Sequence, residues 1–318
     1  MLTVQKFGGS SLASEEKLRR AAALVRREIA RGRSVAVVVS AMGDATDELL
    51  AMAYSLSSAP SGRELDALLS TGECASAALL AITLEEAGQS AASFTGWQSG
   101  IFTDEAHGDA RILTLTASRL RAALSRGVVP VVSGFQGIDS AGDLTTLGRG
   151  GSDTTAVALA AALHADSCDI YTDVDGIYTA DPRLVPSARL LAAADIRDML
   201  RLSYAGAQVL HFRCLELALE KGVALTLRPA QNDGPGTRVA LLPDAERPAL
   251  AGLAGRGERV TLVGRASAEQ QDALPEILRA AGIRVLDVGS GRDEAWASIP
   301  PDRCAAALRA LHARFFED

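Results

Sequence analysis

A repeated order of strand, glycine turn and helix constrains this chain more than any other feature of its sequence. Residues 34–39 (Ser-Val-Ala-Val-Val-Val) form a nearly continuous β-branched run, which is typical of a strand buried on both faces. Before it come an apolar strand at 2–7, a glycine turn at 8–11 and apolar residues at helical spacing up to residue 29. Strands alternating with helices predict an α/β fold whose mostly parallel sheet lies between helices.

The length of the chain and a polar stretch with glycine and proline predict two domains. At ~150 residues per domain, 318 residues suggest about two. Residues 229–248 are polar and contain Gly234-Pro235-Gly236, so we interpret them as the approach to a linker. The order strand, helix, strand, strand, helix follows, with one more strand possible at 249–254, which suggests a small ferredoxin-like module. We therefore place one domain at 1–245 and a second at 246–318.

Charge and composition disfavour several classes of function. The net charge is −7 and no basic stripe is present, which disfavours binding to nucleic acid or to an anionic membrane. The longest apolar runs, such as 155–163, are shorter than the ~20 residues of a membrane span, and the chain begins at once with a strand rather than a signal segment. The four cysteines and four histidines follow no metal-binding motif. We expect reduced thiols, a cytoplasmic location and no metal ligands from the protein.

The first candidate motif is Lys6 followed by Gly8-Gly9-Ser10-Ser11, at the end of a predicted strand and the start of a helix. Glycines at such a turn let backbone N–H groups approach an anion, and the positive end of the helix adds to the attraction. Lys6 could neutralise phosphate oxygens. A tight strand-to-helix turn would use the same glycines, so both interpretations stay open.

A second glycine-rich loop, residues 145–155, also leads into a predicted helix. Arg149 offers a planar fork that suits a carboxylate or a phosphate, and Ser152 or Asp153 can cap the helix. Two such loops in one α/β domain favour an anion site over a mere cap and a solvated charge. The polar loop at 171–183 follows a strand and on its own predicts only a turn.

Ser40 and Thr46 stand at the carboxyl end of the buried strand, which is where open α/β sheets bind ligands. Glu73 lies among apolar residues of a predicted helix. Its carboxylate would be costly to bury without a partner, and the amino group of a ligand is one such partner. Exposure of Glu73 on the outer face of the helix is the alternative.

Together these segments resemble the aspartate kinases of the amino acid kinase superfamily, over residues 2–240. The motifs that carry the resemblance are, in chain order, KFGGSS (6–11), SAMGDATD (40–47), STGE (70–73), FTGWQSG (94–100), HGDARI (107–112), GFQG (134–137), TTLGRGGSDTTAVA (145–158) and YTDVDGIYTADPR (171–183). Each is weak alone, but the ordered set is highly specific. The resemblance implies a three-layer αβα sandwich, the amino acid kinase fold, followed by an ACT-like module.

The resemblance also implies a reaction and a set of roles. The reaction is ATP-dependent phosphorylation of the side-chain carboxylate of L-aspartate to 4-phospho-L-aspartate, with Mg²⁺ as cofactor. Lys6 would be the main charge stabiliser, and Asp153 would organise Lys6 or the metal-phosphate assembly. The implied nucleotide site comprises Lys6, Gly8, Gly9, Ser10, Thr172, Asp173, Tyr178, Asp181, Arg183 and Gln208. The implied aspartate site comprises Ser40, Thr46, Glu73, Arg149, Gly150, Gly151 and Ser152, with Glu73 on the ammonium and Arg149 on a carboxylate. A homodimer is expected.

Three departures from the family pattern carry their own expectations. Gln208 stands where the family usually has lysine, so we expect weaker ATP binding. Cys74 stands where arginine is common, which could loosen the position of Glu73. The chain has room for one ACT-like module instead of two, and the last strand of that module would be missing after residue 316. Inhibition by lysine or threonine is therefore expected to be lost or altered.

Two other functions stay open at this point. The chain could be a kinase for an aspartate analogue in a specialised pathway, since Trp97 could reshape the entrance to the site. It could also be a catalytically weak regulatory or partner subunit, which Gln208 and Cys74 favour slightly.

Overall fold

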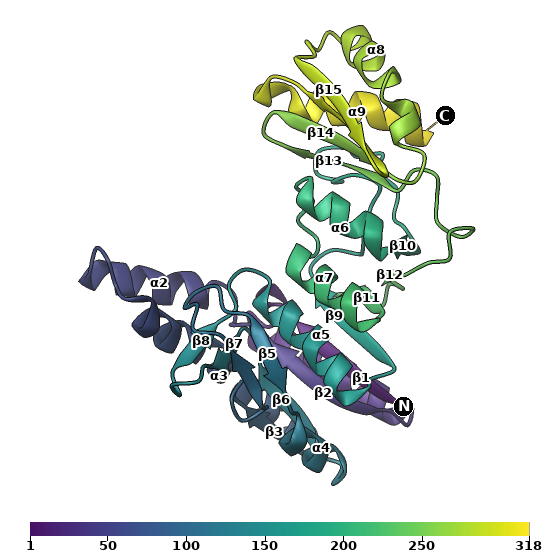
Figure 1. Ribbon diagram of the computed structural model, residues 1–318. Coiled ribbons are helices and arrows are strands. Elements are labelled where there is room, and N and C mark those ends of the chain that lie inside the picture. Colours follow the sequence, from purple (N-terminus) through teal and green to yellow (C-terminus); the bar gives the residue numbers. More distant parts are fainter. Residues whose placement is uncertain (318) are drawn as a thin grey trace. The chain divides into compact units, whose positions relative to one another are not determined.

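The computed structural model describes residues 1–317, and its contacts divide the chain into two compact units (Figure 1). The first unit comprises residues 1–174 and 220–234, and the second comprises residues 175–219 and the chain from 235 onward. The predicted boundary between a catalytic domain at 1–245 and an end module at 246–318 stays a prediction.

A six-stranded parallel sheet forms the centre of the first unit, in the order β11-β9-β1-β2-β6-β3. The predicted α/β class with a parallel sheet is thereby confirmed. The strands are β1 (Leu2–Phe7), β2 (Ser34–Val39), β3 (Ala91–Phe94), β6 (Val129–Ser133), β9 (Ser167–Thr172) and β11 (Leu225–Pro229).

Helices cover both faces of this sheet because alternate residues of each strand point to opposite sides. Phe7, Val37 and Val39 pack in one apolar cluster with helices α1 (Glu15–Ala30) and α3 (Gly62–Glu86). Helices α4 (Ser118–Leu124) and α5 (Gly151–Leu163) contact strands β1, β2, β6 and β9. Figure 1 shows α5 crossing in front of the strands. The result is three layers, as expected for the amino acid kinase fold.

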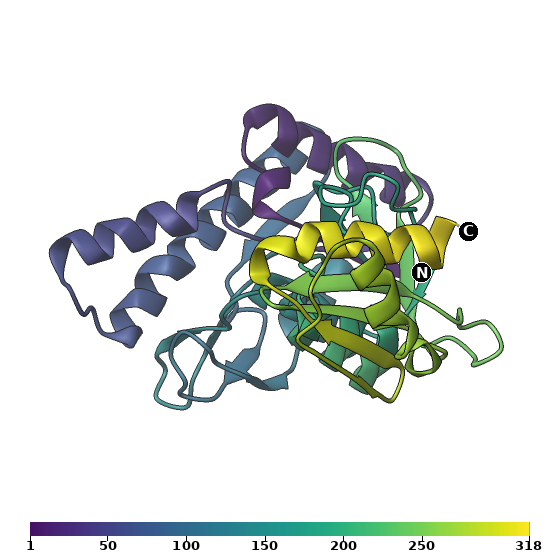
Figure 2. The same ribbon diagram turned by 90° about the horizontal axis from the view of Figure 1, so that it is seen from above.

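Helix α3 is the one helix among residues 1–317 whose length and composition would allow it to cross a membrane. Core helices of globular proteins meet the same test. Here α3 packs against β3, β6 and β8 and buries the carboxylates of Asp66 and Glu73, which places it in the core of the first unit. Its first turns pair with helix α2 (Ala45–Leu56), and Figure 2 shows this pair extending away from the sheet.

A small second sheet in the first unit was not predicted. Its order is β5-β4-β7-β8, with β4 (Ile101–Thr103), β5 (Ile112–Leu115), β7 (Gln136–Ile138) and β8 (Leu144–Thr146). Strands of three or four residues are too short to show an alternation of apolar and polar side chains. This sheet matters for function because β8 leads directly into the loop that carries Arg149.

The second unit begins with a short parallel pair, β10 (Ala193–Asp195) and β12 (Thr237–Ala240). Strand β12 lies inside the stretch interpreted as the approach to a linker, so that interpretation was incomplete. Helices α6 (Ile196–Tyr204) and α7 (Phe212–Lys221) follow β10 along the chain. Helix α7 begins at Phe212, and Gln208 lies exposed in the loop before it.

The rest of the second unit is a four-stranded antiparallel sheet with two helices. The strand order is β13-β14-β16-β15, with β13 (Gly252–Arg256), β14 (Arg259–Val263), β15 (Asp287–Gly291) and β16 (Glu294–Ser298). Helices α8 (Ala273–Ala280) and α9 (Cys304–His312) accompany it, and a π-helical turn follows at Ala313–Glu317. In a β-α-β-β-α-β module the fourth strand follows the second helix. Here β13 opens the module and lies beside β14, at the place where the sequence allowed one more strand (249–254).

The loop after β9 is built into this module. The carbonyl oxygen of Thr179 accepts a hydrogen bond from Leu253 N in β13 (2.7 Å), and its Oγ1 lies 2.8 Å from Nε2 of the fully buried His312. Ala180 and Val185 belong to the same apolar cluster as Leu253. The loop after β9, which contains the predicted nucleotide-site residues Tyr178, Asp181 and Arg183, therefore packs in the same apolar core as the end module.

Candidate active site

An ion pair lies at the carboxyl end of the central strand β1. The Nζ of Lys6 is 2.6 Å from Oδ1 of Asp153, and the two side chains are only 11% and 15% exposed. Strand alternation turns Lys6 toward α5, whose first turn holds Asp153. The predicted partnership between these two residues is thus observed as a contact, while its catalytic role stays a prediction.

The turn after Lys6 packs closely on a neighbouring loop. Residues Gly9–Ser11 form a 3₁₀ turn, and Gly8 N donates to the carbonyl oxygen of Tyr171 (3.2 Å). A Cβ at residue 9 would lie 2.5 Å from the carbonyl oxygen of Ala41, so only glycine allows the two segments to approach this closely. Gly9 therefore has a structural role, whether or not the turn also binds an anion.

Glu73 is buried, with 3% of its surface exposed, so the alternative of an exposed position is wrong. Its Oε1 accepts a hydrogen bond from Ala41 N (3.0 Å), whereas Oε2 is buried and has no hydrogen-bond partner among residues 1–317. Gly72 makes this contact possible, because a Cβ there would lie 2.9 Å from the Cβ of Ala41. A buried carboxylate with one unpartnered oxygen is suited to receive a donor from a ligand.

Burial raises the pKa of Glu73 to about 7. The backbone N–H groups of Ala41 and Glu73 and the positive charge of Lys6 act in the opposite direction and favour the carboxylate. An ammonium group beside Oε2 would complete the hydrogen bonds of the carboxylate and hold it ionised. Lys6 lies near the end of β1, and Ala41, the backbone partner of Glu73, follows the neighbouring strand β2, so both residues lie at the same edge of the sheet.

The other predicted aspartate-site residues of the first unit lie around this edge. Ser40 follows β2 and Thr46 is in the first turn of α2, and both are half-buried. Ser152 is 7% exposed in the first turn of α5, where Gly134 leaves room for it. Arg149 is exposed in the loop before α5, between Gly148 and Gly150, which both have positive φ. These are separate elements whose ends converge, as expected where parallel strands end.

A network centred on Asp66 holds the Arg149 loop and was not anticipated. Asp66 is 1% exposed, and its carboxylate accepts hydrogen bonds from Thr146 Oγ1 (2.5 Å) and Gly108 N (3.1 Å) and lies 2.8 Å from Nδ1 of His107. Thr146 ends β8, three residues before Arg149. In the sequence, His107 belongs to the HGDARI motif and to no metal-binding pattern, so this role was not predicted. The available signal was Asp66 itself, a carboxylate on an apolar helix like Glu73.

Asp66→Asn is expected to raise the KM for aspartate, the substrate that the resemblance implies, about tenfold while kcat changes less, because a small displacement of a residue that positions the substrate is costly. The asparagine amide would place a donor against the donors of Thr146 and Gly108, which also costs about 1–3 kcal/mol of stability. Steady-state kinetics at saturating ATP measure the split between KM and kcat.

Asp139→Asn is the matched control. Asp139 is also buried, at 6% exposure, but its Oδ1 accepts only from Ala141 N and Asp143 N within its own turn (2.9 Å each). Both variants lose stability, so an equal rise in KM for the two would show that Asp66 has no positioning role.

The predicted nucleotide-site residues divide between the two units. Thr172 and Asp173 follow β9 in the first unit, where Thr172 Oγ1 donates to Asp173 Oδ1 (3.1 Å). In the second unit the hydroxyl of Tyr178 donates to Asp175 Oδ2 (3.4 Å). Arg183 donates to Asp181 Oδ2 (2.7 Å), and this hydrogen bond lowers the pKa of Asp181. Gln208 also lies in the second unit, and the roles of all these residues stay predictions.

Two further expectations concern metal binding and Cys74. Within residues 1–317, no three side chains of the types His, Cys, Asp and Glu gather in a group that could hold a metal ion. Mg²⁺ in kinases is held mainly by phosphates and water, with one or two carboxylates, so Asp153 could serve without such a group. Cys74 follows Glu73 and contacts Gln136 Oε1 through its sulfur (3.8 Å).

Comparisons with known proteins agree with this architecture. Residues 1–228 match the amino acid kinase family. An aspartokinase of Geobacillus stearothermophilus is 49% identical over 266 residues, which is 83% of this chain. The crystal structure of aspartate kinase from Synechocystis superposes with a TM-score of 0.70 at 32% identity, covering 99% of this chain and 69% of that one. E. coli aspartokinase III in complex with aspartate and ADP gives a TM-score of 0.74 at 26% identity, covering 98% of this chain and 84% of that one.

The chain therefore belongs to the amino acid kinase family, in its aspartokinase branch, which confirms the resemblance inferred from the motifs. It spans 65% of the length of the Geobacillus relative.

Proposed function

We propose that the protein transfers the γ-phosphoryl group of ATP to the side-chain carboxylate of L-aspartate and forms 4-phospho-L-aspartate. The observation that carries this proposal is the buried, unpartnered Oε2 of Glu73. It offers a place for the α-ammonium of an amino acid, at the sheet edge where Lys6 can face a phosphate. Support also comes from the aspartokinase relatives, one of which was crystallised with aspartate and ADP.

The proposed reaction needs no strong base, because a carboxylate is already a nucleophile. One oxygen of the aspartate side chain attacks the γ-phosphorus, the bond from that phosphorus to the β–γ bridging oxygen breaks, and ADP leaves with the electron pair. Lys6, oriented by Asp153, stabilises the negative charge on the transferring group. Glu73 holds the ammonium and Arg149 the α-carboxylate. Mg²⁺, when bound to the phosphates, would neutralise part of their charge.

The direct test is trapping of the acyl phosphate. With ATP, Mg²⁺, L-aspartate and hydroxylamine, the protein is expected to form aspartyl hydroxamate. A panel of aspartate analogues distinguishes an aspartate kinase from a kinase for an analogue. A faster reaction with an analogue than with aspartate would make that analogue the substrate. Absence of hydroxamate with every amino acid would leave a regulatory or partner subunit as the function.

The KM for aspartate is expected to rise as pH falls below about 7. Protonation of Glu73, whose pKa burial raises to about 7, removes the charge that attracts the ammonium. The ionised fraction falls nearly tenfold per pH unit below the pKa, so KM rises about tenfold from pH 8 to pH 6. Initial rates across this range at saturating ATP measure the effect. A KM that stays constant over these two units would contradict the role of Glu73.

Gln208→Lys is expected to lower the KM for ATP severalfold and to leave the KM for aspartate unchanged. Gln208 is exposed and an amide carries no charge, whereas an ammonium would attract the phosphates. ATP titrations at two salt concentrations measure this effect, which screening by salt should reduce. An unchanged KM for ATP would mean that residue 208 does not approach the nucleotide.

The proposals on regulation and assembly extend those made from the sequence. We propose that residues 246–318 form an ACT-like module, that inhibition by lysine or threonine is lost or altered, and that the protein is a homodimer in the cytoplasm. Strand β13 supports a complete sheet in this module. Kinase assays with excess lysine, threonine or both test the regulatory part, and inhibition by sub-millimolar effector would contradict it.

A further inference from the structure

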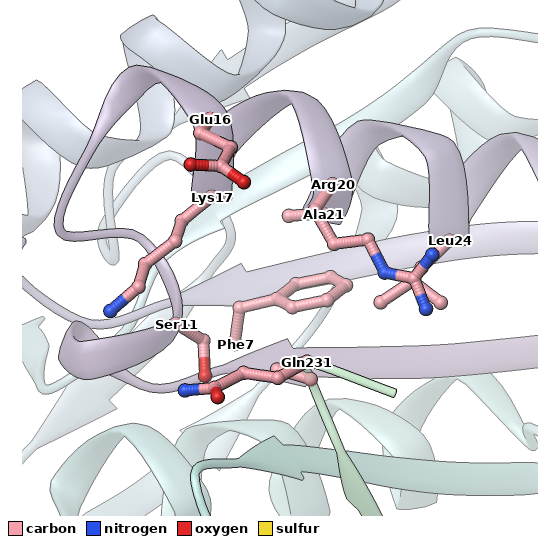
Figure 3. A pocket seen from close by; sticks show the side chains of 9 residues that line it. Phe7, Ser11, Glu16, Lys17, Arg20, Ala21, Leu24 and Gln231 are labelled. Atoms are coloured by element: carbon pink, nitrogen blue, oxygen red, sulfur yellow. The ribbon is translucent and has the colours of Figure 1, made fainter. Parts of the chain in front are cut away.

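A cavity of about 420 Å³ lies between α1 and residues 230–231, on the side of the sheet away from Lys6 (Figure 3). Consecutive residues of a strand point to opposite faces, and β1 shows this directly. Lys6 meets Asp153 of α5, whereas Phe7 lines the cavity with Leu24 of α1. The cavity is therefore distinct from the proposed active site, and its size lies within the range of small-molecule sites.

Unpartnered donors line this cavity. Ser11 is 6% exposed, and its hydroxyl has no hydrogen-bond partner among the described residues. The Nε of Arg20 is likewise buried without a partner, although Nη2 of the same side chain bonds to Asp233 Oδ1 (2.9 Å). Figure 3 shows Ser11 and Gln231 among the residues that line the cavity. Buried donors without partners are costly, which indicates that an acceptor from outside the chain belongs here.

Charge decides what kind of acceptor this is. Lys17 and Arg20 give the wall two cations, and Glu16 is the acidic side chain among its lining residues. Arg20 is also paired with Asp233, which lies outside the lining. Glu16 and Lys17 belong to the first turn of α1, whose N-terminus adds partial positive charge. In that turn Ser14 Oγ caps Lys17 N, and Glu15 is a second acidic residue. The floor is apolar, formed by Phe7, Ala21 and Leu24.

We propose that this cavity binds a small organic anion. Its carboxylate or phosphate oxygens accept hydrogen bonds from the Ser11 hydroxyl and from Arg20, and its short apolar body lies against Phe7 and Leu24. This site shares no residue with the proposed ATP and aspartate sites. Because Ser11 ends the turn that begins at Gly8, an occupant contacts the segment to which the proposed phosphate contacts belong.

Calorimetric titration of the full chain with two probes tests this proposal. Inorganic phosphate represents the phosphate group and butyrate the carboxylate with an apolar body. We expect at least one probe to bind at millimolar concentration, and about tenfold weaker binding to Ser11→Ala and to Arg20→Gln, since hydrogen bonds to a charged group are strong. Lys6→Ala keeps the same affinity, because Lys6 lies on the other face of the sheet.

Arg19→Gln is the matched control on the same helix. Arg19 is largely exposed and pairs with Glu15 of the same helix (2.8 Å). The Arg20→Gln variant keeps the contact between Arg27 and Asp233 (2.7 Å), so the loop that contains Asp233 stays attached to α1.

The two probes also separate the two sources of the anion. Preference for phosphate assigns a phosphate ester and preference for butyrate assigns a carboxylate. Binding of neither probe overturns the proposal, and so does equal binding to Arg20→Gln and Arg19→Gln. Binding that Lys6→Ala abolishes and Arg20→Gln retains places the probe in the proposed active site instead, which also overturns it. Hydroxamate formation reports on the proposed function separately.

Discussion

Glutamine in place of Glu73 is expected to make the protein more stable and to impair the proposed phosphorylation of aspartate in the same variant. The glutamine carbonyl can still accept from Ala41 N, but it carries no charge to hold an ammonium. Losing a charge-assisted contact with the substrate should raise the KM for aspartate about a hundredfold. Kinetics at saturating ATP measure this loss.

The gain in stability follows from the sign of the pKa shift. Burial raises the pKa of Glu73 from 4.5 to about 7 in the folded protein, so folding becomes less favourable as pH rises through this interval. Above it, the buried charge costs about 3 kcal/mol, which the neutral glutamine avoids. The difference in unfolding free energy between variant and wild type should be largest at pH 8 and fall to about 1 kcal/mol or less at pH 5.

Glu85→Gln provides the comparison, because Glu85 is exposed near the end of the same helix. This variant should show neither the gain in stability at pH 8 nor the loss of activity. If Glu73→Gln is less stable than wild type at pH 8, the charge of Glu73 is compensated in the free protein. The proposal that Glu73 lacks a partner until an ammonium group binds would then be wrong.

Lys6→Ala is expected to lower kcat about a thousandfold with little change in the KM for aspartate. A preorganised charge facing the transferring group acts mainly in the transition state, and removing one such group typically costs 10²–10³ in rate. Lys6 is held for this role by Asp153 at 2.6 Å and is mostly shielded from water. Single-turnover formation of hydroxamate measures the chemical step directly.

A double variant separates loss of chemistry from loss of fold. Lys6→Ala leaves Asp153 as a poorly solvated charge, and breaking such a pair costs several kcal/mol. Lys6→Met combined with Asp153→Asn removes both charges and should recover stability without recovering activity. A double variant that is stable and active would show that Lys6 does not stabilise the transferring phosphoryl group.

The sheet of the first unit was predictable because its strands are buried on both faces. The valine-rich segments at 34–39 and 129–133 predict such strands, although apolar and polar residues do not alternate in them. Strands β4 and β8 have three residues each and lack any such signature. Strand β13 could be expected only as a possibility, because its place beside β14 depends on the topology of the whole module.

The site residues that could be predicted are those where a glycine-rich motif stands at the end of a predicted parallel strand. Lys6 and Asp153 are far apart in the sequence, yet each follows from a glycine turn at the edge where parallel strands end. The burial of Glu73 could not be decided from the sequence, because helix α3 contacts the sheet and both α1 and α2 and has no single apolar face. Asp66 was missed for the same reason, since its partners come from two other segments.

Side chains alternate between the two faces of the sheet along β1, so the face on which Lys6 lies depends on the number of residues before it in the strand. This strand is held in parallel register by β2 on one side and β9 on the other, so it cannot slide. Deleting one residue between Leu2 and Lys6 would exchange the two faces and turn the ammonium into the apolar layer under α1, with the ring of Phe7 against Asp153. An insertion or deletion before Lys6 in β1 would therefore separate Lys6 from Asp153, whereas a substitution at another residue of this strand would leave the register unchanged.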